Sequence, residues 1–218
     1  IDFASLIEDG KLITRVKDTS LSSTPIWHDP ANTVVQLLPG SKSTIPEAAA
    51  FSFLGDAGKP FWRVEQTQQP ELIWPGWSTE SIPTSATQAG VTWTLTNMTG
   101  PGEFALFQSG AFGDPQVLFN TRDGISSADQ FEIGKNTHAH GTWAFSAEGT
   151  YCVNFSRSAT LANGTAVSDT YATAFAVGEV DVKEVDPSKC FTDQTGAPQD
   201  PDTTPVAVGD LNDPNAGG

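Results

Sequence analysis

Two histidines separated by one residue are the part of this sequence best suited to bind a metal ion. His138 and His140 lie in the segment Asn-Thr-His-Ala-His-Gly-Thr-Trp, residues 136–143. If this segment is a strand, both imidazoles project from one face, because side chains alternate along a strand. Two neutral imidazole nitrogens suit a divalent transition metal such as zinc or copper. The alternative is a solvent-facing pair that lacks a third ligand and binds a metal only weakly.

The remaining histidine and the carboxylates do not complete this site from sequence alone. His28 lies in a Trp-His-Asp-Pro turn between two strand-like runs, and nothing in the sequence places it near the pair. We interpret His28 as a surface turn residue and keep it as a third candidate ligand. The chain has 26 Asp and Glu residues, so composition does not select a carboxylate ligand.

Two tryptophans flank a rigid Pro-Gly turn at residues 74–77. In one interpretation Trp74 and Trp77 form an aromatic surface that stacks on a sugar ring or contacts a protein partner. In the other, both pack over the end of a β-domain. The other tryptophans lie in strand-like runs and are expected in the core: Trp27, Trp62, Trp93 and Trp143.

Motifs of the common enzyme classes are missing from the sequence. It contains no Gly-x-Ser-x-Gly elbow, no glycine-rich phosphate loop, no His-Glu-x-x-His and no Cys-x-x-Cys. The sequence therefore does not argue for an enzyme. The two cysteines, Cys152 and Cys190, are compatible with one disulfide formed in an oxidising compartment, and equally with two buried free thiols.

The elements that must position these residues are mostly strands. Apolar residues alternate at period two in residues 91–95, 142–145, 151–155 and 171–177, and residues 104–107 form a continuous apolar run. Residues 46–53, with three consecutive alanines, predict a short helical turn. We therefore predict an all-β fold, an immunoglobulin-like or jelly-roll-type β-sandwich. Tyr151, just after Gly149, is typical of the tyrosine corner of immunoglobulin-like domains.

Charge and composition divide the chain near residue 178. The 218 residues carry a formal charge of −15, which disfavours nucleic acid and anionic membrane surfaces as partners. Residues 179–218 hold nine acidic residues, two lysines and five prolines, which is typical of a solvated linker. We predict an all-β surface domain over residues 1–178, immunoglobulin-like in its part 91–178, and an acidic tail over 179–218.

The two ends of the sequence suggest export. No apolar run is long enough to span a membrane, and residues 1–5 do not resemble a signal peptide. A chain that opens on Ile1 is expected to have lost a leader, and a tail of this kind is expected to continue into an anchor.

Several short motifs follow one another within residues 1–178. They are Asp-Gly-Lys-Leu (9–12), Phe-Leu-Gly-Asp-Ala-Gly (53–58), Ile-Trp-Pro-Gly-Trp-Ser-Thr-Glu (73–80), Gly-Pro-Gly-Glu-Phe (100–104), His-Ala-His-Gly-Thr-Trp-Ala-Phe (138–145) and Gly-Thr-Tyr (149–151). In this order they resemble the actinobacterial surface-anchored protein family called choice-of-anchor M. The resemblance implies an exported cell-surface protein of a Gram-positive actinobacterium. Members of the family resemble components encoded beside metal-type ABC transporters, which implies a role in metal handling.

The family pattern also places Gly-His before a Val/Ile-Asp pair, and Ile1-Asp2 matches that pair. The resemblance thus implies a histidine upstream of Ile1 as a third ligand, and an incomplete site within this chain. Two hypotheses follow. In the first, His138 and His140 bind a divalent transition metal together with a nearby carboxylate or the missing upstream histidine, and the partners are transporter subunits or other cell-envelope components. In the second, the chain is a structural or interaction module of the cell envelope that binds a protein or glycan through Trp74 and Trp77.

Overall fold

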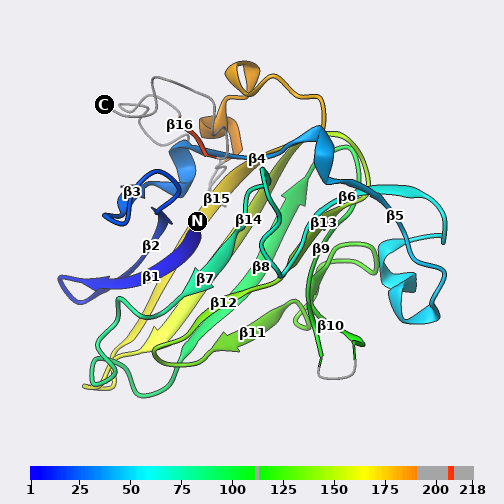
Figure 1. The fold of residues 1–218 in the computed structure, drawn as a ribbon. Coiled ribbons are helices and arrows are strands. Elements are labelled where there is room, and N and C mark those ends of the chain that lie inside the picture. Colours follow the sequence, from blue (N-terminus) through cyan, green and yellow to red (C-terminus); the bar gives the residue numbers. More distant parts are fainter. Residues whose placement is uncertain (111–112, 191–205, 209–218) are drawn as a thin grey trace.

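A computed structural model describes residues 1–110, 113–190 and 206–208, and these fold into three packed β-sheets (Figure 1). This confirms the predicted all-β sandwich. The first sheet consists, in spatial order, of β12 (His138–His140), β7 (Gly76–Ser78), β1 (Asp2–Glu8), β2 (Lys11–Asp18) and β3 (Ile26–His28). The second consists of β10 (Pro115–Asn120), β9 (Phe104–Ser109), β13 (Thr142–Phe145), β6 (Pro60–Val64) and β5 (Lys42–Thr44). The third consists of β11 (Gln130–Ile133), β8 (Val91–Thr99), β14 (Gly149–Thr160), β15 (Ala166–Val177), β4 (Thr33–Leu37) and β16 (Val206–Val208).

The helical elements of the described residues are short 3-10 turns. They are η1 (Pro30–Asn32), η2 (Pro39–Ser41), η3 (Ala49–Leu54), η4 (Val182–Glu184) and η5 (Pro187–Cys190). The helical turn predicted over residues 46–53 corresponds to η3, which begins and ends slightly later. None of the helices in the described part of the chain is long and apolar enough to cross a membrane.

The apolar patterns located five strands correctly, but they did not predict β1 and β2. Strands β14 and β15 pair antiparallel along twelve residues each, from the Gly149–Val177 pair to the Thr160–Ala166 pair. Every predicted run of residues 91–95, 104–107, 142–145, 151–155 and 171–177 lies within one strand. Burial alternates along residues 91–95 and 151–155, where one face meets the core, whereas residues 104–107, 142–145 and 171–177 are buried on both faces.

Aromatic side chains fill the core between the sheets. Trp93 and Trp143 are fully buried and Trp62 is 7% exposed, as predicted for core tryptophans. Trp27 is 41% exposed, so the prediction that it belongs to the core is wrong. It lies on β3, a three-residue strand at the edge of the first sheet, whose residues are all exposed or half-buried, so the core does not cover this ring.

A tyrosine corner closes one end of the third sheet. The Tyr151 hydroxyl donates a hydrogen bond to the carbonyl oxygen of Ala147 at 2.8 Å, which confirms the predicted role of this residue. Burial raises the pKa of Tyr151 to about 12, so the hydroxyl keeps the proton that this bond requires.

A buried arginine joins the first sheet to the third. Arg157 on β14 is fully buried and donates to the Ser5 hydroxyl at 2.6 Å and to the Phe3 carbonyl oxygen at 2.9 Å. Its guanidinium lies 4.6 Å from the Trp93 ring centre, a favourable cation–π distance. These contacts fasten β1 at the strand end that carries Asp2.

The chain stays attached to the domain after β15. Cys190 is buried and forms a disulfide with Cys152, so the first of the two thiol interpretations is confirmed. Val185 is also buried against the domain, and contact therefore extends beyond the predicted boundary at residue 178. The rest of the predicted acidic linker, apart from β16, lies outside the described residues.

Candidate metal site

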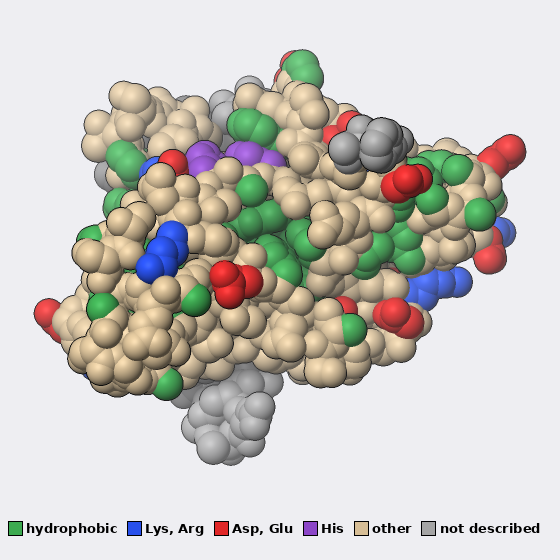
Figure 2. Space-filling model, turned by 90° about the horizontal axis from the view of Figure 1, so that it is seen from below, with side chains coloured by type: hydrophobic (Ala, Val, Ile, Leu, Met, Phe, Trp, Pro, Cys, Tyr) green, Lys and Arg blue, Asp and Glu red, His purple; other side chains and the backbone are tan. Residues whose placement is uncertain are grey.

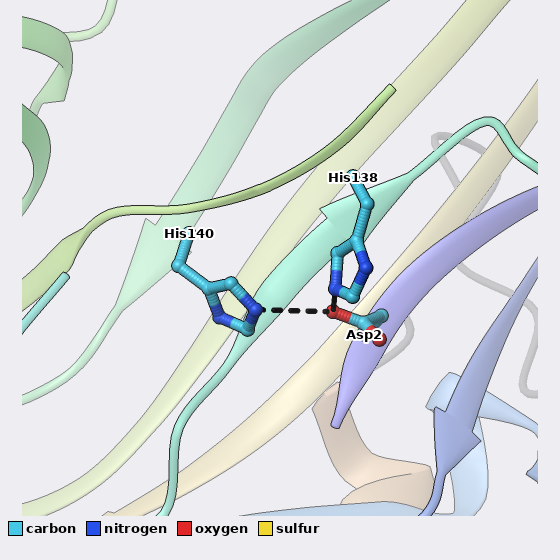
Figure 3. A group of neighbouring side chains, drawn as sticks. All are labelled: Asp2, His138 and His140. Atoms are coloured by element: carbon cyan, nitrogen blue, oxygen red, sulfur yellow. Dashed lines mark hydrogen bonds and ion pairs between the residues drawn. The ribbon is translucent and has the colours of Figure 1, made fainter. Parts of the chain in front are cut away.

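One short strand brings the candidate ligands together. Strand β7 pairs antiparallel with β12, placing Gly76 opposite His140, and parallel with β1, placing Gly76 opposite Asp2. Asp2 and His140 therefore flank the same residue from two sides, although 138 positions separate them in the sequence. His138 follows on the same face of β12, as the alternation of side chains predicts (Figure 3).

The three side chains converge on a common point. The Nε2 atom of His138 lies 2.9 Å from Asp2 Oδ1, and the Nε2 atom of His140 lies 3.8 Å from the same oxygen (Figure 3). One donor atom from each residue lies within 4.8 Å of the others. Ligands of a tetrahedral zinc ion are about 3.3 Å apart, given metal–ligand bonds of about 2.0–2.1 Å. Asp2, His138 and His140 could therefore hold a metal ion after small side-chain movements.

Gly76 leaves the space in which these side chains meet. A β-carbon on Gly76 would lie 2.6 Å from Asp2 Oδ1 and 2.7 Å from His140 Cε1. It would also lie 2.7 Å from the carbonyl oxygen of Ala139, a backbone atom of the facing strand. A larger residue at this position would push the ligands apart.

Burial differs among the three residues and leaves one side of the site open. Asp2 is 5% exposed, and the His140 side chain is 11% exposed. Burial lowers the pKa of His140, opposed by the nearby Asp2 carboxylate, and so favours the neutral imidazole that binds metal. The His138 side chain is 39% exposed. The space-filling view shows histidine side chains together at the surface of the molecule (Figure 2).

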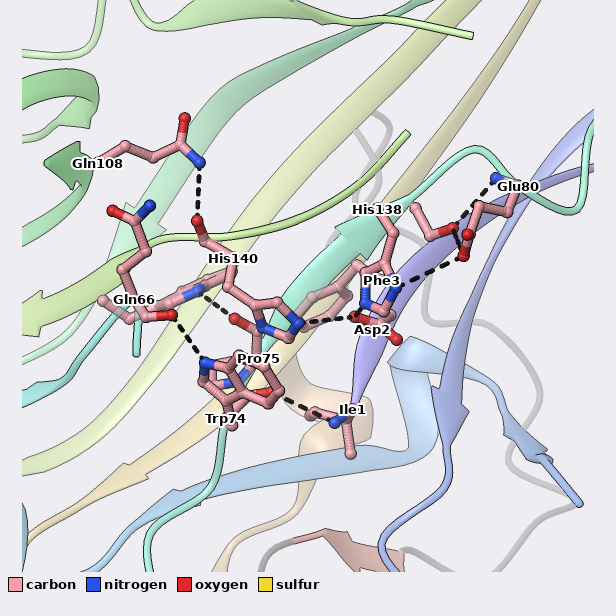
Figure 4. A network of polar contacts seen from close by, with 12 residues as sticks. Ile1, Asp2, Phe3, Gln66, Trp74, Pro75, Glu80, Gln108, His138 and His140 are labelled. Atoms are coloured by element: carbon pink, nitrogen blue, oxygen red, sulfur yellow. Dashed lines mark hydrogen bonds and ion pairs between the residues drawn. The ribbon is translucent and has the colours of Figure 1, made fainter. Parts of the chain in front are cut away.

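Polar and aromatic neighbours surround the ligands. Trp74 stacks on His140, with ring centres 3.6 Å apart and ring planes 6° from parallel. A carboxylate oxygen of Glu80 lies 3.5 Å from His138 Nδ1, on the side of the ring away from Asp2 (Figure 4). The Gln108 side-chain amide donates to the His140 carbonyl oxygen at 2.7 Å and fastens β12 to β9.

The third histidine lies elsewhere in the first sheet. His28 is on β3, at the opposite edge from β12, with its Nε2 atom 3.7 Å from an Asp18 carboxylate oxygen. The nearby His28 ring, with a smaller contribution from Ser20, lowers the pKa of Asp18 to about 2. The structure thus does not bring His28 to the pair, and we drop it as a candidate ligand.

The two tryptophans of the predicted aromatic surface have different environments. Trp77 is 2% exposed and packs against Trp93 and Phe131 with ring centres 5.7 and 5.5 Å away. The prediction that Trp77 contacts a partner is therefore wrong, because its ring belongs to the core, as the packing interpretation expects. Trp74 is half-buried against His140 and belongs to the surroundings of the candidate metal site.

Sequence reasoning missed Asp2 as a ligand. Its signal was an acidic residue at the start of a mostly apolar run, residues 2–7, but the presence of 26 acidic residues in the chain gave no reason to select it. The resemblance placed the third ligand upstream of Ile1, whereas Asp2 supplies a third donor atom within this chain.

The donor set is two imidazole nitrogens and one carboxylate oxygen, which suits zinc or copper better than calcium or magnesium.

Comparison with protein-family models finds no match, and comparisons with curated proteins and with solved structures find none either.

Proposed function

We propose that this chain is a metal-binding module that takes up a divalent transition metal, zinc or copper, through Asp2, His138 and His140. The observation that carries the proposal is the convergence of these three donors within 4.8 Å. Both histidines of β12 take part, in a chain that has only 3 histidines.

The donor count supports reversible binding. Structural zinc sites are closed by four protein ligands, whereas a site with three protein ligands keeps a position for water or another ligand. The exposed side of His138 gives that position access to solvent. We infer that the bound metal exchanges with the surroundings and is not needed to hold the fold.

The charge of the chain favours the approach of cations. A formal charge of −15 creates a negative potential that raises the local concentration of a divalent cation near the surface. The effect is strongest at low ionic strength, because salt screens exposed charges over about 10 Å at 0.1 M.

We also propose that the protein acts outside the cell, at the surface of an actinobacterium, and serves metal uptake by an ABC transporter. The resemblance to the choice-of-anchor M family supports this proposal. The Cys152–Cys190 disulfide agrees with it, since disulfides are common in proteins of oxidising compartments. Transporter subunits or other cell-envelope components are the partners it implies.

The alternative, an envelope module that binds protein or glycan through an aromatic surface, receives less support. It requires Trp77 to be accessible, and this side chain is 2% exposed. We therefore do not carry the alternative further.

Elemental analysis tests the metal-binding proposal. Untagged protein, loaded with zinc or copper and freed of excess metal, should retain about one ion per chain. The His138→Ala/His140→Ala double variant should retain almost none, and Asp2→Asn should bind more weakly. His28→Ala is the matched control, since it removes a histidine at the opposite edge of the same sheet. Equal and negligible metal in the wild type and the double variant would refute the proposal.

The pH dependence of binding adds a second measurement. A protonated imidazole has no lone pair for the metal, so the metal affinity should decrease as the pH is lowered below about 6. Titration calorimetry at pH values from about 5 to about 8 measures this change in metal affinity.

A further inference from the structure

We propose that Glu80 and Trp74 are positioning residues of the metal site, each holding one histidine ring with its Nε2 atom toward Asp2. Neither belongs to the three converging donors. The inference rests on the proposed function, because the orientation of the rings matters only if the site binds a metal.

Glu80 acts on His138 from the side opposite Asp2. Its carboxylate oxygen lies 3.5 Å from Nδ1, while Nε2 of the same ring lies 2.9 Å from Asp2 Oδ1. Without a metal, Asp2 is the nearer carboxylate and lies within hydrogen-bond distance of Nε2. When a metal takes Nε2 and Asp2 Oδ1 as ligands, the proton of the neutral ring must lie on Nδ1, and a carboxylate beside that nitrogen stabilises it there. Glu80 therefore favours Nε2 of His138 as the ligand atom of the loaded site.

Glu80 is itself held by the strand that faces His138. The Ser78 hydroxyl donates to the Glu80 carboxylate at 3.3 Å and accepts a hydrogen bond from the Glu80 backbone N–H at 3.1 Å. Ser78 is buried and lies directly opposite His138 in the β7–β12 pairing. The carboxylate is thus tied to the same strand pair as the ring that it orients (Figure 4).

Trp74 acts on His140 through face-to-face contact. The rings are 3.6 Å apart and 6° from parallel, so rotation of the imidazole about its bond to Cβ would break the contact. The indole N–H of Trp74 donates to the Gln66 carbonyl oxygen at 2.9 Å, which fixes the indole in turn (Figure 4).

The orientation of His140 leaves one nitrogen for a metal. Its Nδ1 atom is buried and has no hydrogen-bond partner in the described part of the chain, whereas Nε2 faces Asp2 Oδ1 at 3.8 Å. A turned ring would lose both the stack with Trp74 and the approach to Asp2. Trp74 therefore preorganises His140, which lowers the ordering cost of binding.

The experiment measures zinc affinity by competition with a chelator for the full chain and five variants. Glu80→Ala should weaken binding by about 10- to 100-fold, the range found when partners of ligand histidines are removed. Glu80→Gln keeps an oxygen acceptor for Nδ1–H and should recover most of that loss. Glu47→Ala is the matched control, because it removes an exposed carboxylate that makes no contact with the site.

The Trp74 variants follow the same design. Trp74→Ala should weaken binding by about 2- to 10-fold, the equivalent of one aromatic stack. Trp74→Phe keeps a stacking ring and should lie closer to the wild type. Thermal unfolding without zinc identifies which variants are folded, and the two conservative variants, Glu80→Gln and Trp74→Phe, keep the comparison interpretable if an alanine variant unfolds.

Long-range proton–nitrogen NMR of the zinc-loaded protein supplies a readout that a purely structural role would not change. The wild type should show zinc on Nε2 of both His138 and His140. In Glu80→Ala, part of His138 should bind through Nδ1 instead. Failure of the wild type to bind zinc would overturn the proposed function itself. Zinc binding by the wild type, with Glu80→Ala and Trp74→Ala binding as tightly through the same nitrogens, would overturn this inference alone.

Discussion

A single methyl group at Gly76 is the sharpest perturbation of the candidate site. In Gly76→Ala the new β-carbon would lie 2.6 Å from Asp2 Oδ1 and 2.7 Å from both His140 Cε1 and the Ala139 carbonyl oxygen. Ordinary contacts of a β-carbon begin near 3.4 Å. Asp2 and His140 must therefore each move by several tenths of an ångström, and the Ala139 backbone limits how β12 can yield.

The displacement allows two estimates. Overpacking of a close-packed position costs about 1–3 kcal/mol, so the free energy of unfolding should fall by that amount. In a chain of this size the thermal midpoint would fall by about 2–12 °C, at about 2–4 °C per kcal/mol. Ligand distances in metal sites lie within about 0.2 Å of their standard values, so a displacement of Asp2 and His140 by more than this should lower zinc affinity.

Urea unfolding and zinc competition measure the two effects separately. Gly40→Ala is the matched control, because a β-carbon there would meet only Leu72 Cδ2, at 3.8 Å. Its stability should stay within about 0.5 kcal/mol of the wild type and its zinc affinity should be unchanged. If Gly76→Ala retained wild-type stability and wild-type zinc affinity, the argument that Gly76 makes room for the ligands would be wrong.

Three further predictions concern the packing and the charges outside the site. Trp77→Ala should lower the free energy of unfolding by about 3–5 kcal/mol in urea titrations, because removal of its buried ring would leave a cavity. An unchanged stability would contradict the assignment of Trp77 to the core. Replacing Cys152 and Cys190 by alanine opens a link across 38 positions and should cost about 3–4 kcal/mol on the chain-entropy account, measured by the same titration. The pKa of Asp18 is lowered from 3.8 to about 2, so its ion pair with His28 contributes stability above pH 3.8 that is lost as pH falls toward 2. In His28→Ala the loss of stability between those pH values should be smaller than in the wild type. Acid unfolding followed by circular dichroism measures this loss, and identical acid unfolding curves for the variant and the wild type would contradict this account.

Local patterning was sufficient to predict the all-β class, the strands β8, β9, β13, β14 and β15 and one corner of the fold, but not the strands β1 and β2. Residues 91–95 alternate because this strand presents one face to the core, whereas residues 171–177 are buried on both faces and alternate between large side chains on one face and small ones on the other. Both patterns are visible without any tertiary information. The Tyr151 corner was also predictable, because its partner is Ala147, four residues away. Patterning did not separate exposed Trp27 from buried Trp77, since burial depends on which strand covers each residue.

The candidate site shows the same division between local and long-range information. The sequence alone determined that His138 and His140 share one face if their segment is a strand, because two residues make one period of a strand, and the structure shows that strand as β12. Tertiary structure alone decided that Asp2 is the third donor and that Glu80 and Trp74 flank the rings. The reason is that β7 pairs with β1 on one side and β12 on the other, and pairing between strands so distant in the chain leaves no periodic signal in the sequence.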